Sequence, residues 1–238
     1  GLVAFDGKRL DLSLRGSMNG RGAWSGLGPV TAADADETTA LKRALAGFQF
    51  SASSVAVSAS QDELSVSLGV PARIHTDTGG DVTLYRGGGP IFSNGAGAFE
   101  LRVAGGGLPQ AELSVSRYRV TDQGLAATAA LKAKGGFAPI SDGSIEAAGD
   151  VRLAGGGVTF TAARCVPVSA AHVELGENDL ERLEARLCPS GAPMLTMADG
   201  AWRLRGKAQG LAAALPSVEV RIAQGEGALD LSGRGARL

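Results

Sequence analysis

Residues 64–70 read Leu-Ser-Val-Ser-Leu-Gly-Val, so apolar residues alternate with small polar ones. Successive side chains of a β-strand point to opposite faces of its sheet, and this alternation predicts a strand with one apolar and one polar face. A sheet with one wet face is typical of antiparallel strands, because parallel strands buried on both faces are apolar throughout. The stretch therefore favours an antiparallel sheet.

The same period of two recurs along the chain. It is clearest over residues 10–15, 99–103 and 218–222, where Leu, Val, Ile or Phe alternates with charged or small polar residues. Weaker stretches of the same kind occupy residues 48–57, 82–84, 113–115, 151–153, 158–160 and 202–204. Many short strands of this kind predict an all-β fold.

Runs of glycine separate these stretches and predict tight turns, because glycine reaches positive φ without steric cost. They lie at residues 79–80, 87–89, 105–107, 135–136 and 155–157. Hairpin would then follow hairpin in an antiparallel meander. We treat residues 1–238 as a single elongated β-sheet segment of a longer polypeptide, with a soft boundary near residues 135–143.

The composition supports a thin sheet and argues against several classes of protein. Glycine accounts for 36 of 238 residues, roughly twice its average share, while aromatic residues make up only 5%. No Gly-X-Y period is present, which excludes collagen. The net charge of -1 lacks the basic excess typical of nucleic-acid binding. No apolar run is long enough to span a membrane.

One segment predicts a short helix, near residues 34–46. Acidic Asp34, Asp36 and Glu37 begin it and basic Lys42 and Arg43 end it, charges that complement the helix dipole. A second segment, residues 179–188, fits either a helix or a strand. We favour a strand there, because Pro189 and strand-like neighbours surround it.

Weak internal repetition is visible. Residues 97–101, 200–204 and 227–231 share a Gly-Ala-apolar-polar-Leu frame, and the Gly-Asp-Val-x-Leu of residues 80–84 returns at 149–153. The spacing is irregular, which argues against a β-helix with fixed coils. A meander of related hairpins and chance in a Gly- and Ala-rich chain both remain open.

Residues suited to catalysis or to metal binding are scarce. His75 and His172 are the only histidines, and no Gly-x-Ser-x-Gly elbow accompanies them. The two cysteines and two histidines lack the spacing of a zinc site. We therefore predict neither an enzyme nor a cofactor or metal.

The two cysteines are more informative. Cys165 follows a strand-like run, and Cys188 precedes Pro189 at the end of another. Facing each other across neighbouring strands, they would form a disulfide in an oxidising compartment. The alternative is a pair of buried free thiols in a reducing one.

The alternating strands and Gly-rich turns resemble the AsmA-like superfamily of TamB- and YdbH-type proteins. The resemblance is most specific over residues 143–153 and from Arg164-Cys165 through Leu187-Cys188-Pro189 to Trp202-Arg203-Leu204, and is greatest to the YdbH branch. It implies a non-enzymatic bridge across the periplasm, anchored in the inner membrane by regions outside this sequence, whose long, curled, groove-like sheet carries phospholipid between inner and outer membranes. The implied partners are phospholipid acyl chains and neighbouring sheet segments of the same polypeptide.

The groove that the resemblance implies would be lined by the aliphatic and aromatic residues of the alternating stretches. These candidates are Leu10, Leu12, Leu14, Leu64, Val66, Leu68, Phe99, Leu101, Val103, Leu113, Val115, Val151, Leu153, Val218, Val220, Ile222, Leu229 and Leu231.

Two alternatives share the same composition. A structural or adhesive β-solenoid of the cell envelope would have parallel strands and a regular coil. A β-sandwich binding module would cover both apolar faces with protein and gather exposed aromatic residues in one patch. Its candidates are Trp24, Tyr85, Tyr118 and Trp202.

Overall fold

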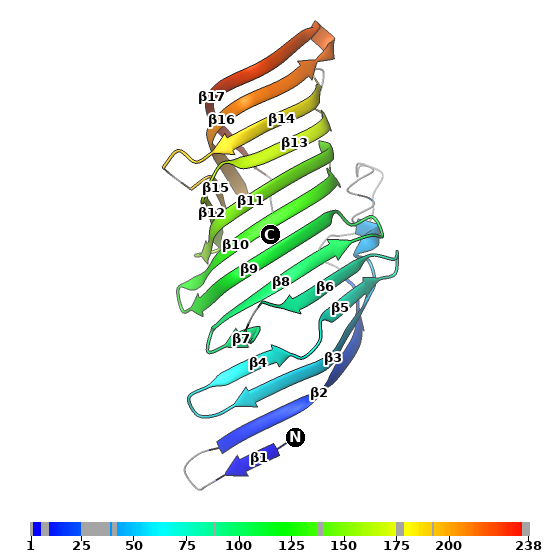
Figure 1. Ribbon diagram of the computed structural model, residues 1–238, viewed down its shortest axis with the longest axis vertical. Coiled ribbons are helices and arrows are strands. Elements are labelled where there is room, and N and C mark those ends of the chain that lie inside the picture. The colour runs from blue at the N-terminus through cyan, green and yellow to red at the C-terminus, as the bar shows by residue number, and fades with distance from the viewer. Residues whose placement is uncertain are drawn as a thin grey trace. The chain divides into compact units, whose positions relative to one another are not determined.

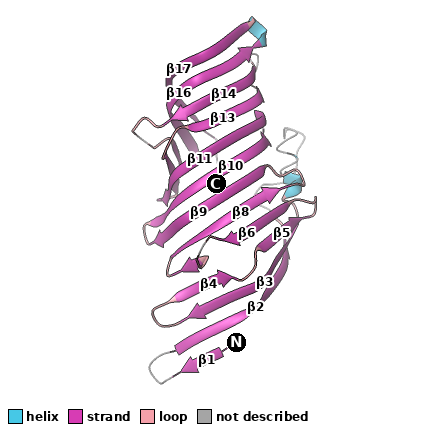
Figure 2. Ribbon diagram, viewed as in Figure 1, coloured by secondary structure: helices cyan, strands magenta, loops and turns pink. Residues whose placement is uncertain are grey.

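The computed structural model describes residues 2–5, 10–24, 39, 42–87, 89–137, 140–174, 179–191 and 193–234, and most of them lie in β-strands (Figure 1, Figure 2). Each ladder whose register is defined is antiparallel, which confirms the predicted antiparallel, all-β fold. The chain divides into two compact units, Gly1–Val120 and Thr121–Leu238.

The described residues of the first unit form nine strands, the last ending at the division between the units. They are β1 Leu2–Phe5, β2 Leu10–Gly22, β3 Phe48–Ala59, β4 Leu64–Leu68, β5 Ala72–Thr76, β6 Asp81–Arg86, β7 Phe92–Ser93, β8 Ala96–Ala104 and β9 Gln110–Thr121. The second unit contains β10 Gly124–Phe137, β11 Ile140–Ala154, β12 Gly157–Ala162, β13 Val166–Val173, β14 Leu180–Cys188, β15 Leu195–Ala198, β16 Ala201–Leu215 and β17 Val220–Arg234.

In the first unit one long strand changes partners along its length. β3 pairs with β4 over residues 55–59 and with β5 over residues 48–51. β6 then pairs with β5 and β7 pairs with β4, and β8 pairs with both β6 and β7. Four short strands thus fill the space between the long strands β3 and β8.

The second unit repeats this arrangement. β11 pairs with β12 over residues 149–154 and with β13 over residues 140–145. β14 pairs with β13, β15 pairs with β12, and β16 pairs with both β14 and β15. β2 and β10 flank the long strands at one side and β9 and β17 at the other, so β2–β9 and β10–β17 share one topology.

A small hydrophobic cluster fills the gap where the short strands meet end to end. In the first unit Ala52, Leu68 and Ala72 are buried there, with Ile91 packed against them. In the second unit Ala162, Val166 and Met194 take the corresponding places. The ends of β4 and β5 face each other across the first cluster, and the ends of β12 and β13 across the second.

Matching hairpins also precede β8 and β16. Asn94 and Gly95 have φ of 47° and 77°, and Asp199 and Gly200 have φ of 51° and 71°. Two consecutive positive φ values are typical of the two-residue turns that match the twist of a hairpin. When these turns are aligned, residues 95–96 correspond to 200–201. The repeat seen in the sequence matched residues 97–98 with 200–201 instead, so it is offset by two positions. The other repeated stretches, residues 227–231 and the pair 80–84 and 149–153, lie in strands that do not correspond between the two units.

The predicted helix is confirmed where the structure describes it. Residues 42–44 are helical and Ala44 is fully buried, while residues 25–38, 40 and 41 lie outside the described chain. The helix ends before Gly47, whose carbonyl accepts a hydrogen bond from the Asp77 N–H at 3.0 Å. The segment over residues 179–188 is a strand, β14, as favoured.

Two details of the sequence prediction need correction. Gly135 and Gly136 lie inside β10 and do not form a turn, since Gly135 pairs with Gly143 of β11 beside a bulge. For the same reason the soft boundary near residues 135–143 falls within the β10–β11 ladder, and the units divide at Val120 instead.

Candidate functional site

An apolar surface runs across the strands of the first unit. Residues paired in an antiparallel ladder point to the same face, so the register defines the face directly. Leu14 pairs with Val57, which pairs with Val66 of β4. Farther along, the pairs Val82–Val103 and Leu101–Leu113 continue it through β6, β8 and β9. We call this surface the apolar face of unit 1.

The second unit carries a surface of the same kind. Val151 of β11 pairs with Ala127 and with Phe160, and Leu204 of β16 pairs with Leu195 and with Leu231. In the other half of the ladder Ile145 pairs with Val168. We call this surface the apolar face of unit 2.

Most of the groove candidates lie on these two faces. On unit 1 they are Leu12, Leu14, Leu64, Val66, Leu68, Phe99, Leu101, Val103, Leu113 and Val115. On unit 2 they are Val151, Leu153, Val220, Ile222, Leu229 and Leu231. Whether they bind lipid stays a prediction.

Two candidates differ from the rest. Leu10 pairs with Phe5 in the β1–β2 ladder, and its side chain lies outside the described part of the chain. Val218 does not belong to a strand. Pro216–Val218 form a 3-10 turn and Glu219 is left-handed with φ of 53°, so the strand starts only at Val220.

Much of the apolar face of unit 2 was not predicted from the sequence. β10 contributes Leu125, Ala127, Ala129 and Leu131, and β13 contributes Val166 and Val168. The period of two is present in β10, but alanine and glycine carry it and weaken the apolar signal.

Both faces keep large aliphatic side chains exposed. On unit 1 Val3, Leu14, Met18 and Leu64 are 44 to 66% exposed, and on unit 2 Ile145, Leu153, Val220 and Leu231 are 38 to 47% exposed. The buried apolar residues are mostly Ala and Val. The well-packed part of each face is the hydrophobic cluster between its short strands. A sheet that buried this face under a second sheet of the same unit would hide these side chains.

The opposite faces are polar and carry ion pairs. In unit 2 Glu146 accepts from Arg164 at 3.0 Å and lies 3.5 Å from the Lys132 ammonium. On β16 and β17, Arg203 Nε donates to Asp230 Oδ1 at 2.7 Å. The hydrogen bond from Arg203 lowers the pKa of Asp230, which keeps this carboxylate charged on an exposed surface.

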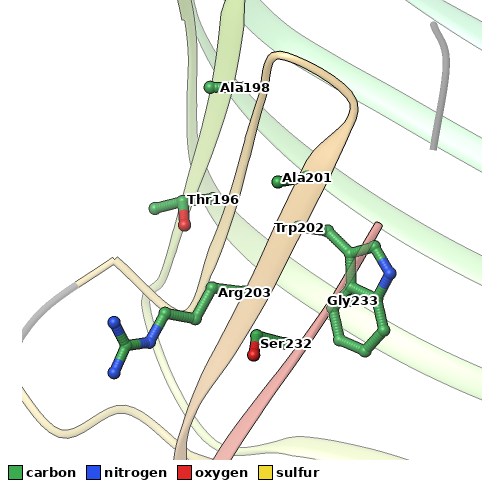
Figure 3. A pocket seen from close by; sticks show the side chains of 7 residues that line it. All are labelled: Thr196, Ala198, Ala201, Trp202, Arg203, Ser232 and Gly233. Carbon is green, nitrogen blue, oxygen red and sulfur yellow. The ribbon is translucent and has the colours of Figure 1, made fainter. Parts of the chain in front are cut away.

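Figure 3 shows the two-sided character of β16. Trp202 and Arg203 are consecutive, and their side chains project to opposite sides of the strand. The Trp202 ring lies over Gly233 of β17, where a Cβ would come within 2.7 Å of the indole nitrogen. A hollow of about 370 Å³ beside this strand is lined by Thr196, Ala198, Ala201, Trp202, Arg203, Ser232 and Gly233. Its one charged group, Arg203, is already paired with Asp230.

The histidines pair with carboxylates on the polar faces. His75 Nδ1 lies 2.9 Å from Asp81 Oδ1, its partner in the β5–β6 ladder. His172 Nε2 lies 3.5 Å from Asp179 Oδ2. Within the described chain, no three His, Cys, Asp or Glu side chains are grouped so as to hold a metal ion.

The aromatic residues named for a sandwich module do not form one patch. Tyr85 lies on the polar face of unit 1 with the Arg102 guanidinium 5.1 Å from its ring. Tyr118 lies on the apolar face, 5.9 Å from Phe99, and donates to the Ile91 carbonyl at 2.6 Å. Burial raises the pKa of Tyr118. Tyr85 and Tyr118 therefore lie on opposite faces of unit 1, each with its own contacts, and Trp24 is 58% exposed.

The predicted disulfide is confirmed. Cys165 and Cys188 are joined with an S–S distance of 2.05 Å and Cα atoms 4.0 Å apart. Cys165 directly precedes β13 and Cys188 ends β14, next to the pair Val166–Leu187. The bond thus crosses from β13 to β14 beside the junction of short strands in unit 2. Disulfides of this kind are typical of proteins in oxidising compartments.

Comparisons with known proteins identify no relative. No family model, curated protein or solved structure matches the chain. Among the described residues, no helix has the length and hydropathy needed to cross a bilayer.

Proposed function

We propose that the two apolar faces hold the acyl chains of phospholipids, and that the chain is a non-enzymatic segment of a periplasmic bridge that carries phospholipid between the inner and outer membranes. The observation that carries this proposal is the row of exposed aliphatic side chains on one face of each unit, opposite a face that is polar. An apolar sheet face in water requires a cover.

The chemistry of the faces favours hydrocarbon over protein as that cover. Protein interfaces are enriched in Tyr, Trp and Arg and carry about one hydrogen bond per 100–200 Å². The paired positions of these faces are almost all Leu, Val, Ile, Ala, Phe or Gly, with few groups that could form a hydrogen bond. A partner without donors or acceptors leaves no polar group unsatisfied on such a surface.

The gain from covering the face is large enough for binding. Each CH₂ removed from water contributes about 0.8 kcal/mol, so an acyl chain of some 16 carbons would gain on the order of 10 kcal/mol before entropy losses. The disulfide supports the periplasm as the compartment. The inter-membrane route rests on the AsmA-like resemblance.

The described strands give less support to the alternatives. A β-solenoid is built from parallel coils, whereas each defined ladder here is antiparallel. A closed sandwich would cover its apolar face with a second sheet, whereas Val3 and Met18 of unit 1 are 66% and 57% exposed on that face.

Replacing exposed leucines of the apolar faces by glutamine should release bound lipid. The protein would be purified from its envelope without detergent exchange, and phospholipid counted by native mass spectrometry. In the variant Leu14→Gln/Leu231→Gln each replaced leucine loses about 1.5–3 kcal/mol of apolar contact, so lipid occupancy should fall about tenfold or more.

The matched control is Arg15→Gln/Ser232→Gln, in which the neighbouring exposed residues of the polar faces are changed. This variant should retain the phospholipid of the wild type. A wild-type protein that carries no phospholipid, or two variants that lose it equally, would refute the proposed function.

A further inference from the structure

Arg86 is a charged residue on a face that is otherwise apolar. It ends β6, two residues after Leu84, and pairs with Phe99 of β8. Leu84 pairs with Leu101 on the same face, and the alternation of β6 places Arg86 on that face as well. At the other paired strand positions on the apolar face of unit 1, the described chain has no Asp, Glu, Lys or Arg.

The guanidinium of Arg86 is exposed and only partly used. Its Nε donates to the carbonyl of Gly89 at 3.1 Å, which fixes the head of the side chain beside the β6–β7 connection. Among the described residues no carboxylate lies within ion-pair distance of it. The arginines that do form ion pairs in the ladders, Arg102 with Glu112 and Arg203 and Arg205 with Asp230, lie on polar faces.

Its neighbours make the site amphipathic. Leu84 and Ile91 pack against the buried cluster of Ala52, Leu68 and Ala72, and Phe99 lies opposite Arg86 in the ladder. A ligand there meets hydrocarbon on the strands and one cation at the end of β6. Arginine presents a planar fork of donors that matches the oxygens of a phosphate, and such charge-assisted bonds are about twice as strong as neutral ones.

We infer that Arg86 is a specificity-determining residue that binds the phosphate of an anionic phospholipid while the acyl chains lie on the apolar face of unit 1. This inference rests on the proposed function and adds the class of head group. It assigns the choice between a phosphorylated lipid and a neutral one to a single side chain.

Two lipids that differ only in the phosphate test it. Binding of phosphatidic acid and of diacylglycerol with identical acyl chains to the full chain would be measured by displacement of a fluorescent fatty acid. Wild-type protein should bind phosphatidic acid about tenfold more tightly. Arg86→Gln should abolish that preference and leave the affinity for diacylglycerol unchanged.

Arg73→Gln is the matched control, because Arg73 is exposed on β5 and pairs with Thr83 on the polar face. It should keep the preference. Arg86→Lys keeps the charge without the planar fork and should fall between wild type and Arg86→Gln. Millimolar inorganic phosphate should not displace phosphatidic acid, since it lacks the acyl chains.

The outcomes separate this inference from the proposed function. If the two lipids bind equally, if Arg86→Gln keeps the preference, or if inorganic phosphate competes, the role of Arg86 is overturned while acyl-chain binding stands. If neither lipid binds, both fail.

Discussion

Replacing both cysteines of the Cys165–Cys188 disulfide by alanine is expected to lower the free energy of unfolding of the second unit by about 3 kcal/mol. The bond closes a loop with a sequence separation of 23 residues. Without it the unfolded chain regains the conformational entropy of that loop, which favours unfolding. In urea, with a slope of about 1–3 kcal/mol per molar, the midpoint of unfolding should fall by about 1–3 M.

Reductant provides the control for this measurement. Unfolding of the wild-type protein in dithiothreitol should approach that of Cys165→Ala/Cys188→Ala, and the variant itself should not respond to the reductant. Equal midpoints for the oxidised wild type and the variant would show that the bond does not stabilise the unit.

The second large effect is expected at the cluster in the first unit. Leu68 is only 6% exposed between the ends of the short strands, and Leu68→Ala should cost about 2–4 kcal/mol because it removes buried apolar contacts and leaves a cavity. The variant would be compared with wild type by the midpoint of urea unfolding at constant slope.

Leu64 supplies a matched control on the same strand and the same face. It is 45% exposed, and Leu64→Ala should cost less than about 1 kcal/mol. Similar losses for the two variants would mean that the cluster is no more tightly packed than the rest of the face, and that the sheet is held by its ladders alone.

Alternation of residues predicted the strands well, because burial of one face leaves a direct trace in the sequence. β4, β8 and β17 show it in Leu, Val and Phe. It failed at Val218, where Pro216 starts a 3-10 turn and Glu219 takes a left-handed conformation. It was weak in β10, where alanine and glycine occupy most positions of the apolar face beside Leu125 and Leu131.

The change of partners along β3 and β11 could not be predicted from the period of two. Alternation fixes which face a residue takes, but not which strand lies beside it. The repeat of the two units emerges from the register, with Leu68, Ala72 and Ile91 in one cluster and Ala162, Val166 and Met194 in the other. At these three pairs of corresponding positions the residues are apolar but differ in type, so sequence comparison within the chain does not find the repeat.

Arg86 was missed for a related reason. In the sequence it precedes three glycines and resembles the start of a polar turn. Only the pair Arg86–Phe99 in the ladder places it on the apolar face. The disulfide was easier to predict, since both cysteines flank strand-like stretches and cross-strand bonds join such positions.

Site-specific photo-crosslinking in the intact envelope tests the central claim most directly. A benzophenone amino acid would replace Met18 or Val220 on the apolar faces, or their polar-face neighbours Asn19 or Arg221, in the full-length protein. We predict phospholipid adducts at Met18 and Val220 and none at Asn19 and Arg221. Adducts of equal abundance at all four positions, or protein adducts alone at Met18 and Val220, would contradict the account.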